Sequence, residues 1–135
     1  MSFLLDTNVI SDTRKRVPNP GVLRWLSAVS DSDLYLSVLS LGELQRGVLL
    51  KGKTDASAAA ALAHWLNGIE VLFMDRVLPV DTAVCRRWAD ITSSRILPVI
   101  DSLLAATASV HGLTIVTRNL KDFAGLGVAT LNPWE

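Results

Sequence analysis

Five short apolar segments, separated by longer helical patterns, constrain the fold of this chain more than any other feature of its sequence. Short runs of this kind suit strands that are buried on both faces of a parallel sheet. They cover residues 3–5, 34–36, 71–73, 114–116 and 128–130. Because each parallel connection needs a right-handed crossover through a helix, the pattern predicts an α/β fold with a central, mostly parallel sheet of four to five strands flanked by helices.

Helical patterns fill the intervals between these segments. Residues 56–67 are rich in alanine and have a high intrinsic preference for helix, which Gly68 is expected to end. In the helix predicted over residues 82–94, Cys85 falls on the apolar side and is expected in the core. The other predicted helices begin at Asn8 and at Pro20 and cover residues 38–50 and 98–112.

Composition narrows the class of protein. With 135 residues, of which 50% are hydrophobic and 19% charged, the chain is expected to form one compact domain over residues 1–135. Lys plus Arg equal Asp plus Glu at 13 each, so binding of nucleic acid by bulk charge is not expected.

Cys85 is the only cysteine, which excludes an intramolecular disulfide and a cysteine-based zinc site. Without a basic leader or a long apolar run, a cytoplasmic location and no membrane contact are expected.

Four acidic residues follow the predicted strands. Asp6 comes directly after the first strand, and Asp122 lies beyond the fourth. Glu43 and Asp101 lie near the beginnings of two helices. Because strand ends and adjacent helix beginnings face one crevice, the four carboxylates are expected to converge there. A divalent cation relieves their repulsion, and oxygen ligands favour Mg²⁺ or Mn²⁺ over zinc or copper.

Each of these acids also has a purely structural explanation. Asp6 suits the N-cap of a helix, and Asp101 complements a helix dipole. Ser40 and Glu43 fit a capping box, in which the glutamate reaches back to a serine amide. Asp122 suits a solvated turn. The functional interpretation therefore depends on the joint placement of the four acids and not on any one of them.

Four motifs occur in order along nearly the whole chain: LLDTNVIS at residues 4–11, SLGEL at 40–44, IDSLLAATA at 100–108 and TRNLKDF at 117–123. Together they resemble the motifs of PIN-domain ribonucleases, and specifically those of the VapC toxins of bacterial toxin–antitoxin pairs. The segment DRVLPVD at 75–81 resembles the FitB-like branch of this family.

The resemblance implies a PIN-like three-layer fold and Mg²⁺-dependent cleavage of RNA, with Mn²⁺ as the alternative ion. It implies an acidic site of Asp6, Glu43, Asp101 and Asp122, in which we expect Asp6 and Asp101 to hold the metal directly. Many relatives carry an acid where this chain has Asn119, so the fourth role is open between Asp122 and Asn119. The residues expected to support the acids are Thr7, Asn8, Ser40 and Thr117, with Asn119 as a further candidate.

The resemblance also implies partners. These are the RNA substrate, a cognate antitoxin protein, a second copy of the chain in a homodimer, and DNA only through the antitoxin. Candidate contacts to the RNA backbone are Arg46 and Arg118, together with the basic run 14–16.

Two other classes of protein also place an aspartate after the first strand. A haloacid-dehalogenase-like phosphatase needs a second aspartate two residues further on, where this chain has Asn8. A non-enzymatic receiver or binding domain would use Asp6, Asp75 and Lys121 around a phosphoacceptor, which leaves Glu43 and Asp101 unexplained. Cleavage of DNA in place of RNA also stays open.

Overall fold

The computed structural model describes residues 1–134 and arranges them around a sheet of five strands. The strands are β1 (Phe3–Leu5), β2 (Leu34–Ser37), β3 (Val77–Leu78), β4 (Thr114–Val116) and β5 (Thr130–Leu131). Their order across the sheet is β3-β2-β1-β4-β5, and every neighbouring pair is parallel. The predicted α/β fold with a central parallel sheet is confirmed.

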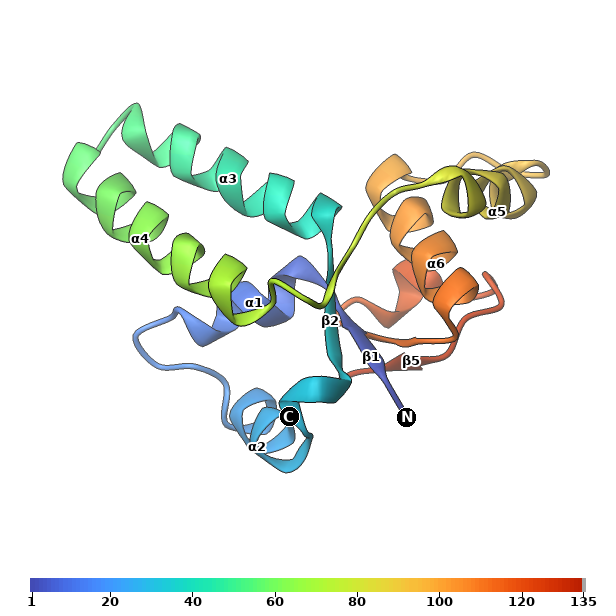
Figure 1. Cartoon of the computed structure of the whole chain (residues 1–135), viewed down its shortest axis with the longest axis horizontal. Coiled ribbons are helices and arrows are strands. Elements are labelled where there is room, and N and C mark those ends of the chain that lie inside the picture. Colours follow the sequence, from blue (N-terminus) through green and yellow to red (C-terminus); the bar gives the residue numbers. More distant parts are fainter. Residues whose placement is uncertain (135) are drawn as a thin grey trace.

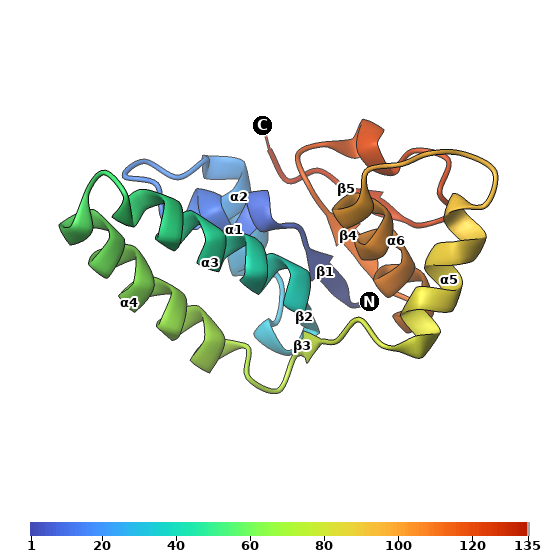
Figure 2. The ribbon, with the colours of Figure 1, turned by 90° about the horizontal axis from the view of Figure 1, so that it is seen from above.

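Helices cover both faces of this sheet (Figures 1 and 2). One side carries α1 (Thr7–Thr13), α2 (Pro20–Ala28), α3 (Val38–Gly52) and α4 (Ala56–Leu72). The other side carries α5 (Thr82–Thr92) and α6 (Val99–His111). Short 3-10 turns, η1 (Asp31–Asp33) and η2 (Leu120–Phe123), precede β2 and follow β4. Among residues 1–134, no helix combines the length and the apolar character needed to cross a bilayer.

Two apolar cores, one on each face, explain why the strand segments are apolar throughout. Phe3 and Leu5 of β1 pack into the core beneath α1–α4, where the ring of Trp25 meets the Phe3 ring edge to face at 5.0 Å. Leu4, which points the opposite way, packs with Leu104 on α6. Because successive strand residues face opposite sides, a strand covered twice needs apolar side chains at every position.

The chain reverses its direction across the sheet between β1 and β4. It runs outward from β1 through β2 to β3 and then returns to β4 on the other side of β1. Ligands of parallel sheets bind at such a switch point, at the carboxyl ends of the strands. Asp6 and Thr117 are the residues that follow β1 and β4, so the fold places them side by side at this point.

The strand predicted over residues 71–73 is wrong. Helix α4 continues through Gly68 to Leu72, and Phe73 is its C-cap, with 5% of its surface exposed. The third strand is the two-residue β3, which pairs with the end of β2. Asp75 therefore precedes β3 and does not end a strand, which removes one support of the receiver interpretation. The fifth strand also lies further along the chain than predicted, at residues 130–131.

The predicted burial of Cys85 is also wrong, because its thiol is exposed. The buried face of α5 is set by Val84, which is fully buried, and by Trp88 one turn later. The indole N–H of Trp88 donates to the Ser102 hydroxyl at 3.0 Å and so ties α5 to α6. The apolar face of this helix thus begins one residue before Cys85.

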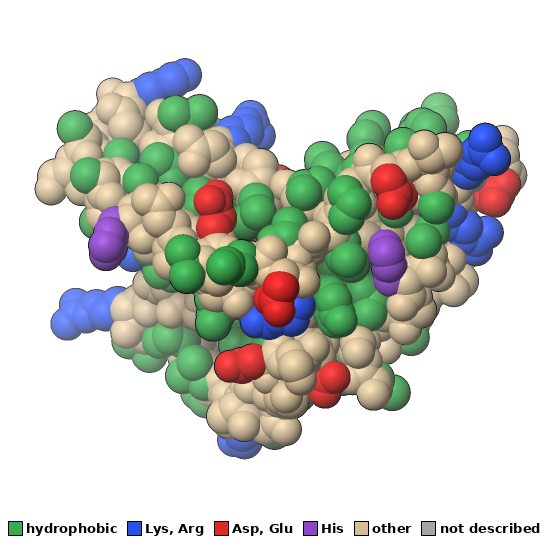
Figure 3. Space-filling model, viewed as in Figure 1, with side chains coloured by type: hydrophobic (Ala, Val, Ile, Leu, Met, Phe, Trp, Pro, Cys, Tyr) green, Lys and Arg blue, Asp and Glu red, His purple; other side chains and the backbone are tan. Residues whose placement is uncertain are grey.

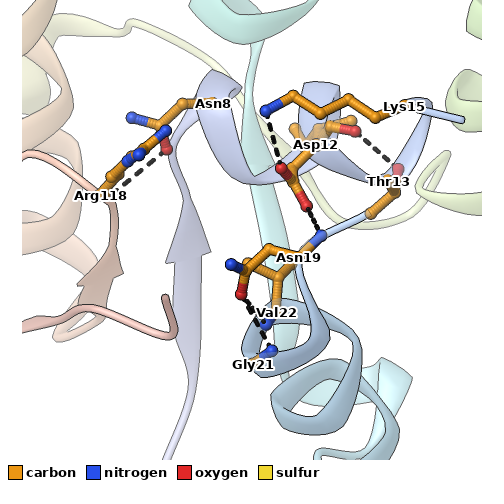
Figure 4. A network of polar contacts seen from close by, with 9 residues as sticks. Asn8, Asp12, Thr13, Lys15, Asn19, Gly21, Val22 and Arg118 are labelled. Carbon is orange, nitrogen blue, oxygen red and sulfur yellow. Dashed lines mark hydrogen bonds and ion pairs between the residues drawn. The ribbon is translucent and has the colours of Figure 1, made fainter. Parts of the chain in front are cut away.

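A buried carboxylate fixes the connection between α1 and α2 (Figure 4). The side chain of Asp12 is only 2% exposed; it accepts the Asn19 N–H at 2.8 Å and pairs with Lys15 at 3.1 Å. The Asn19 side chain in turn caps α2 by accepting the N–H groups of residues 21 and 22. Burial raises the pKa of Asp12, but the Asn19 and Lys15 contacts outweigh it and hold the pKa below its ordinary value.

We predict that Asp12→Ala lowers the free energy of unfolding by about 1–3 kcal/mol, because it leaves the partly buried Asn19 N–H without an acceptor. Urea unfolding at pH 7 measures the effect. The matched control is Asp90→Ala, which removes a 72% exposed carboxylate 3.8 Å from Arg87 and should cost less than about 0.5 kcal/mol. A depressed pKa contributes stability that is lost in acid, so the effect of Asp12→Ala should shrink below pH 3.8. Equal losses in the two variants would contradict this account.

Candidate active site

Asp6 occupies the centre of the carboxyl edge of the sheet. Its Oδ1 accepts the Thr7 N–H at 2.7 Å, so Asp6 is the N-cap of α1. Its Oδ2 accepts the Thr117 hydroxyl at 2.8 Å. Asp6 is 8% exposed, and these two bonds fix the carboxylate in one orientation. The structural and the functional interpretation of Asp6 are therefore compatible.

Thr117 joins the end of β4 to the beginning of α1. Besides its bond to Asp6, its oxygen accepts the backbone N–H of Asn119 at 3.0 Å and lies 3.4 Å from Asn8 Nδ2. Asn8 Nδ2 also lies 3.4 Å from Asp6 Oδ2, and Asn8 Oδ1 lies 3.5 Å from the backbone nitrogen of Arg118 (Figure 4). Thr117 and Asn8 thus contact the Asp6 carboxylate, whereas Asn119 contributes its backbone N–H to this network.

Glu43 enters the site from α3. Its Oε1 accepts the Thr7 hydroxyl at 2.7 Å, which ties the glutamate to the residue that follows Asp6. The predicted capping box of Ser40 and Glu43 is wrong, because Ser37 caps α3 and accepts the Leu39 N–H at 3.0 Å. Ser40 is fully buried, and its Oγ has no hydrogen-bond partner within residues 1–134.

The four acids act on one another electrostatically. Burial raises the pKa of Asp101, in the first turn of α6, and the negative charges of Asp6, Asp122 and Glu43 raise it further. Burial also raises the pKa of Asp6, and the hydrogen bonds from Thr117 and Thr7 oppose this rise. The negative charges of Glu43 and Asp122 raise the pKa of Asp6 further. Each of the other three acids thus adds to the raised pKa of Asp101, and their convergence on one ligand stays a prediction.

The donor set fits a hard divalent cation. No three Asp, Glu, His or Cys side chains in residues 1–134 lie together closely enough to hold a metal ion as they stand. Magnesium does not require three protein ligands, since it is usually held by one or two carboxylates and keeps several waters. Asp6 and Asp101 are the two acids whose pKa values are raised, so a cation placed between them would relieve the largest electrostatic cost. The orphaned Ser40 hydroxyl is a further oxygen in need of a partner.

Two exposed arginines stand near the acids. Arg46 lies three residues after Glu43 on α3, and Arg118 follows Thr117. The guanidinium carbon of Arg118 lies 5.6 Å from the ring centroid of Trp134, in a cation–π contact. The sequence analysis missed Trp134, although an aromatic residue three positions after the last strand is a signal that the chain packs back on the fold.

The comparison with known families settles which class of protein this is. The model of the PIN domain matches residues 3–127. The chain belongs to the PIN-domain family. Toxin FitB of Neisseria gonorrhoeae is 38% identical over 98% of this chain and 99% of its own length. VapC ribonuclease Y4jK of Sinorhizobium fredii is 37% identical over 98% of both chains.

Solved structures agree with this PIN-domain assignment. FitAcB from Neisseria gonorrhoeae superimposes with a TM-score of 0.90 at 37% identity, covering 98% of this chain and 99% of the matched one. The structure of FitAB bound to an IR36 DNA fragment superimposes with a TM-score of 0.90 at 34% identity. The match covers 98% of this chain and 96% of the matched one. The predicted resemblance to the FitB-like branch of the VapC toxins is confirmed, and neither the phosphatase nor the receiver alternative gains support.

We predict that Asp101→Asn raises the melting temperature of the metal-free protein at pH 7 by about 1–3 °C. The raised pKa of Asp101 means that its ionisation opposes folding, and asparagine removes this charge. The stability cost of ionising Asp101 is present in full above its folded-state pKa and is absent below the ordinary value of 3.8. The gain in melting temperature from Asp101→Asn should therefore vanish in acid. Thermal melts in EDTA across pH 3–8 test this; a gain that persists at pH 3 would contradict it.

Proposed function

We propose that this PIN-domain protein is a divalent-metal-dependent endoribonuclease and the toxin of a toxin–antitoxin pair. The observation that supports the proposal is the mutual electrostatic effect of Asp6, Glu43, Asp101 and Asp122, with Asp6 at the switch point of the sheet. The names of its relatives support the activity, since they include VapC ribonuclease Y4jK and the tRNA(fMet)-specific endonuclease VapC of Shigella flexneri.

In this proposal Asp6 and Asp101 hold Mg²⁺ directly, with Mn²⁺ as the alternative. The ion, when bound, polarises the phosphate and acidifies water. Thr117 and Thr7 keep the Asp6 carboxylate in its binding orientation through bonds of 2.8 and 2.7 Å. These bonds are made before any ligand arrives, so little reorganisation is required at the site.

Glu43 acts as the general base. Thr7 occupies its Oε1, which leaves Oε2 to accept a proton from the water that attacks the phosphate. Asp122 takes the fourth acidic role and holds water at the site, with Asn119 as the other candidate. Arg46 and Arg118 bind phosphates of the RNA backbone as it crosses the carboxyl edge.

The proposed partners follow from the solved relatives. FitAB bound to DNA and FitAcB are toxin–antitoxin assemblies by name. By analogy, this chain binds a cognate antitoxin, reaches DNA only through that antitoxin, and forms a homodimer. A cytoplasmic location fits these partners.

We predict that Asp101→Asn lowers the rate of RNA cleavage about 100- to 1000-fold, because it removes a charge that holds the metal at the reacting phosphate. The assay incubates purified protein with total RNA in Mg²⁺ or in EDTA. In parallel, Mn²⁺ should raise the melting temperature of the wild type but not that of the variant. Asp90→Asn, on the exposed face of α5, serves as the control and should cleave normally. Cleavage by Asp101→Asn at the wild-type rate would refute the assignment.

We predict that Arg46→Ala and Arg118→Ala each raise KM several-fold and leave kcat nearly unchanged, since each removes a contact to phosphate. Each should also reduce the slope of log KM against log salt by about 0.7. Lys53→Ala, at the far end of α3, is the matched control with the same loss of charge. An unchanged salt slope in both arginine variants would exclude them from the RNA path.

A further inference from the structure

Two hollows in the surface meet at Glu43. The first has a volume of about 430 Å³ and lies between α1, α3 and α4. Its lining includes Thr7, Arg14, Lys15, Glu43, Gly47 and Trp65. The second, of about 370 Å³, lies between the beginnings of α3 and α6, within the notch that separates α3 from the α5–α6 pair in Figure 3. Its lining includes Val38, Gly42, Glu43, Arg46 and Ile100.

Each hollow is kept open by a glycine inside α3. Gly47 lines the first hollow and Gly42 the second. A Cβ atom built at either position meets no atom within 4 Å, so packing does not require glycine there. Glycine inside a helix is destabilising relative to alanine. The absence of a side chain at these two positions therefore does not serve the folded state, and it leaves open space on both sides of Glu43.

Both hollows combine a largely apolar lining, which can contact bases, with cationic side chains, which can contact phosphates. Arg14 and Lys15 line the first hollow and Arg46 the second, so positive charge is available for phosphates on both sides of the acid. The guanidinium carbon of Arg14 lies 5.8 Å from the ring centroid of Trp65. This stacked pair offers a flat, cationic surface of the kind on which unpaired bases stack.

We propose that one RNA strand crosses α3 over Glu43, with the nucleotides before and after the scissile phosphate lying in different hollows. The inference rests on the proposed nuclease function and extends it by placing the strand. An endonuclease must hold its substrate on both sides of the bond that it cuts, and the two hollows supply these two positions. Since Glu43 lines both hollows, a strand that fills them presents its phosphate to this acid.

The test fills each hollow without disturbing the core. Gly47→Leu and Gly42→Leu add a side chain in open space and improve the helix preference of α3, so both variants should fold and melt at or above the wild-type temperature. The control is Gly68→Leu, because Gly68 lies inside α4, also has no atom within 4 Å of its built Cβ, and lines neither hollow.

Binding is measured by fluorescence anisotropy with a labelled random-sequence RNA about 20 nucleotides long, in the cleavage-deficient Asp101→Asn background. We expect Gly47→Leu and Gly42→Leu each to weaken binding about 5- to 100-fold, and Gly68→Leu to leave it unchanged. In the chain that retains Asp101, the first two substitutions should raise KM by a similar factor.

Binding equal to that of the Gly68→Leu control would overturn the proposed path. So would a loss of antitoxin binding in Gly47→Leu while RNA binding and cleavage stay intact, since the hollow would then be a protein-docking site. These outcomes are distinct from failure of the nuclease function itself, in which the unsubstituted chain cleaves no RNA in Mg²⁺.

Discussion

The hydrogen bond from the Thr117 hydroxyl to Asp6 Oδ2 is the contact on which the acidic site depends. It spans 111 residues of sequence at 2.8 Å, and the Asp6 N–H bond to the Val116 carbonyl, at 2.9 Å, lies beside it. Together these bonds hold a buried carboxylate at the β1–β4 edge against the negative charges of Glu43 and Asp122. They offset part of the cost of burying this charge beside two others.

Several features of this fold oppose folding. Asp6 and Asp101 have raised pKa values, the Ser40 hydroxyl is buried without a partner within residues 1–134, and α3 carries two interior glycines that packing does not need. Each of these features lowers the stability of the folded protein. The two apolar cores supply the stability that tolerates them, since β1 is buried on both faces. Features of this kind are expected where residues are selected for a ligand rather than for stability.

The sequence predicted the elements whose signals are local and left out those that arise from tertiary contact. Three of the five strands follow from apolar runs that end in polar residues. The strand predicted over residues 71–73 is wrong because a three-residue apolar run fits the last turn of a helix as well as a strand. The predicted burial of Cys85 is wrong because the sequence defines the buried face of a helix only to within one residue. The position of the partner helix then decides which residue is buried. The Thr7–Glu43 bond joins residues 36 positions apart, and no periodicity encodes such a contact.

That Thr7–Glu43 bond also gives α1 a role beyond packing. Asp6 caps α1 through the Thr7 N–H, and the Thr7 hydroxyl holds Glu43. One residue therefore links an acid of the sheet edge to an acid of α3, two elements that pack into the same core. Glu43 is exposed and carries a flexible side chain. The bond from Thr7 restricts this side chain in the folded protein, so orienting Glu43 toward a ligand costs less conformational entropy. The first turn of α1 thus links Asp6 at the sheet edge to Glu43 on α3.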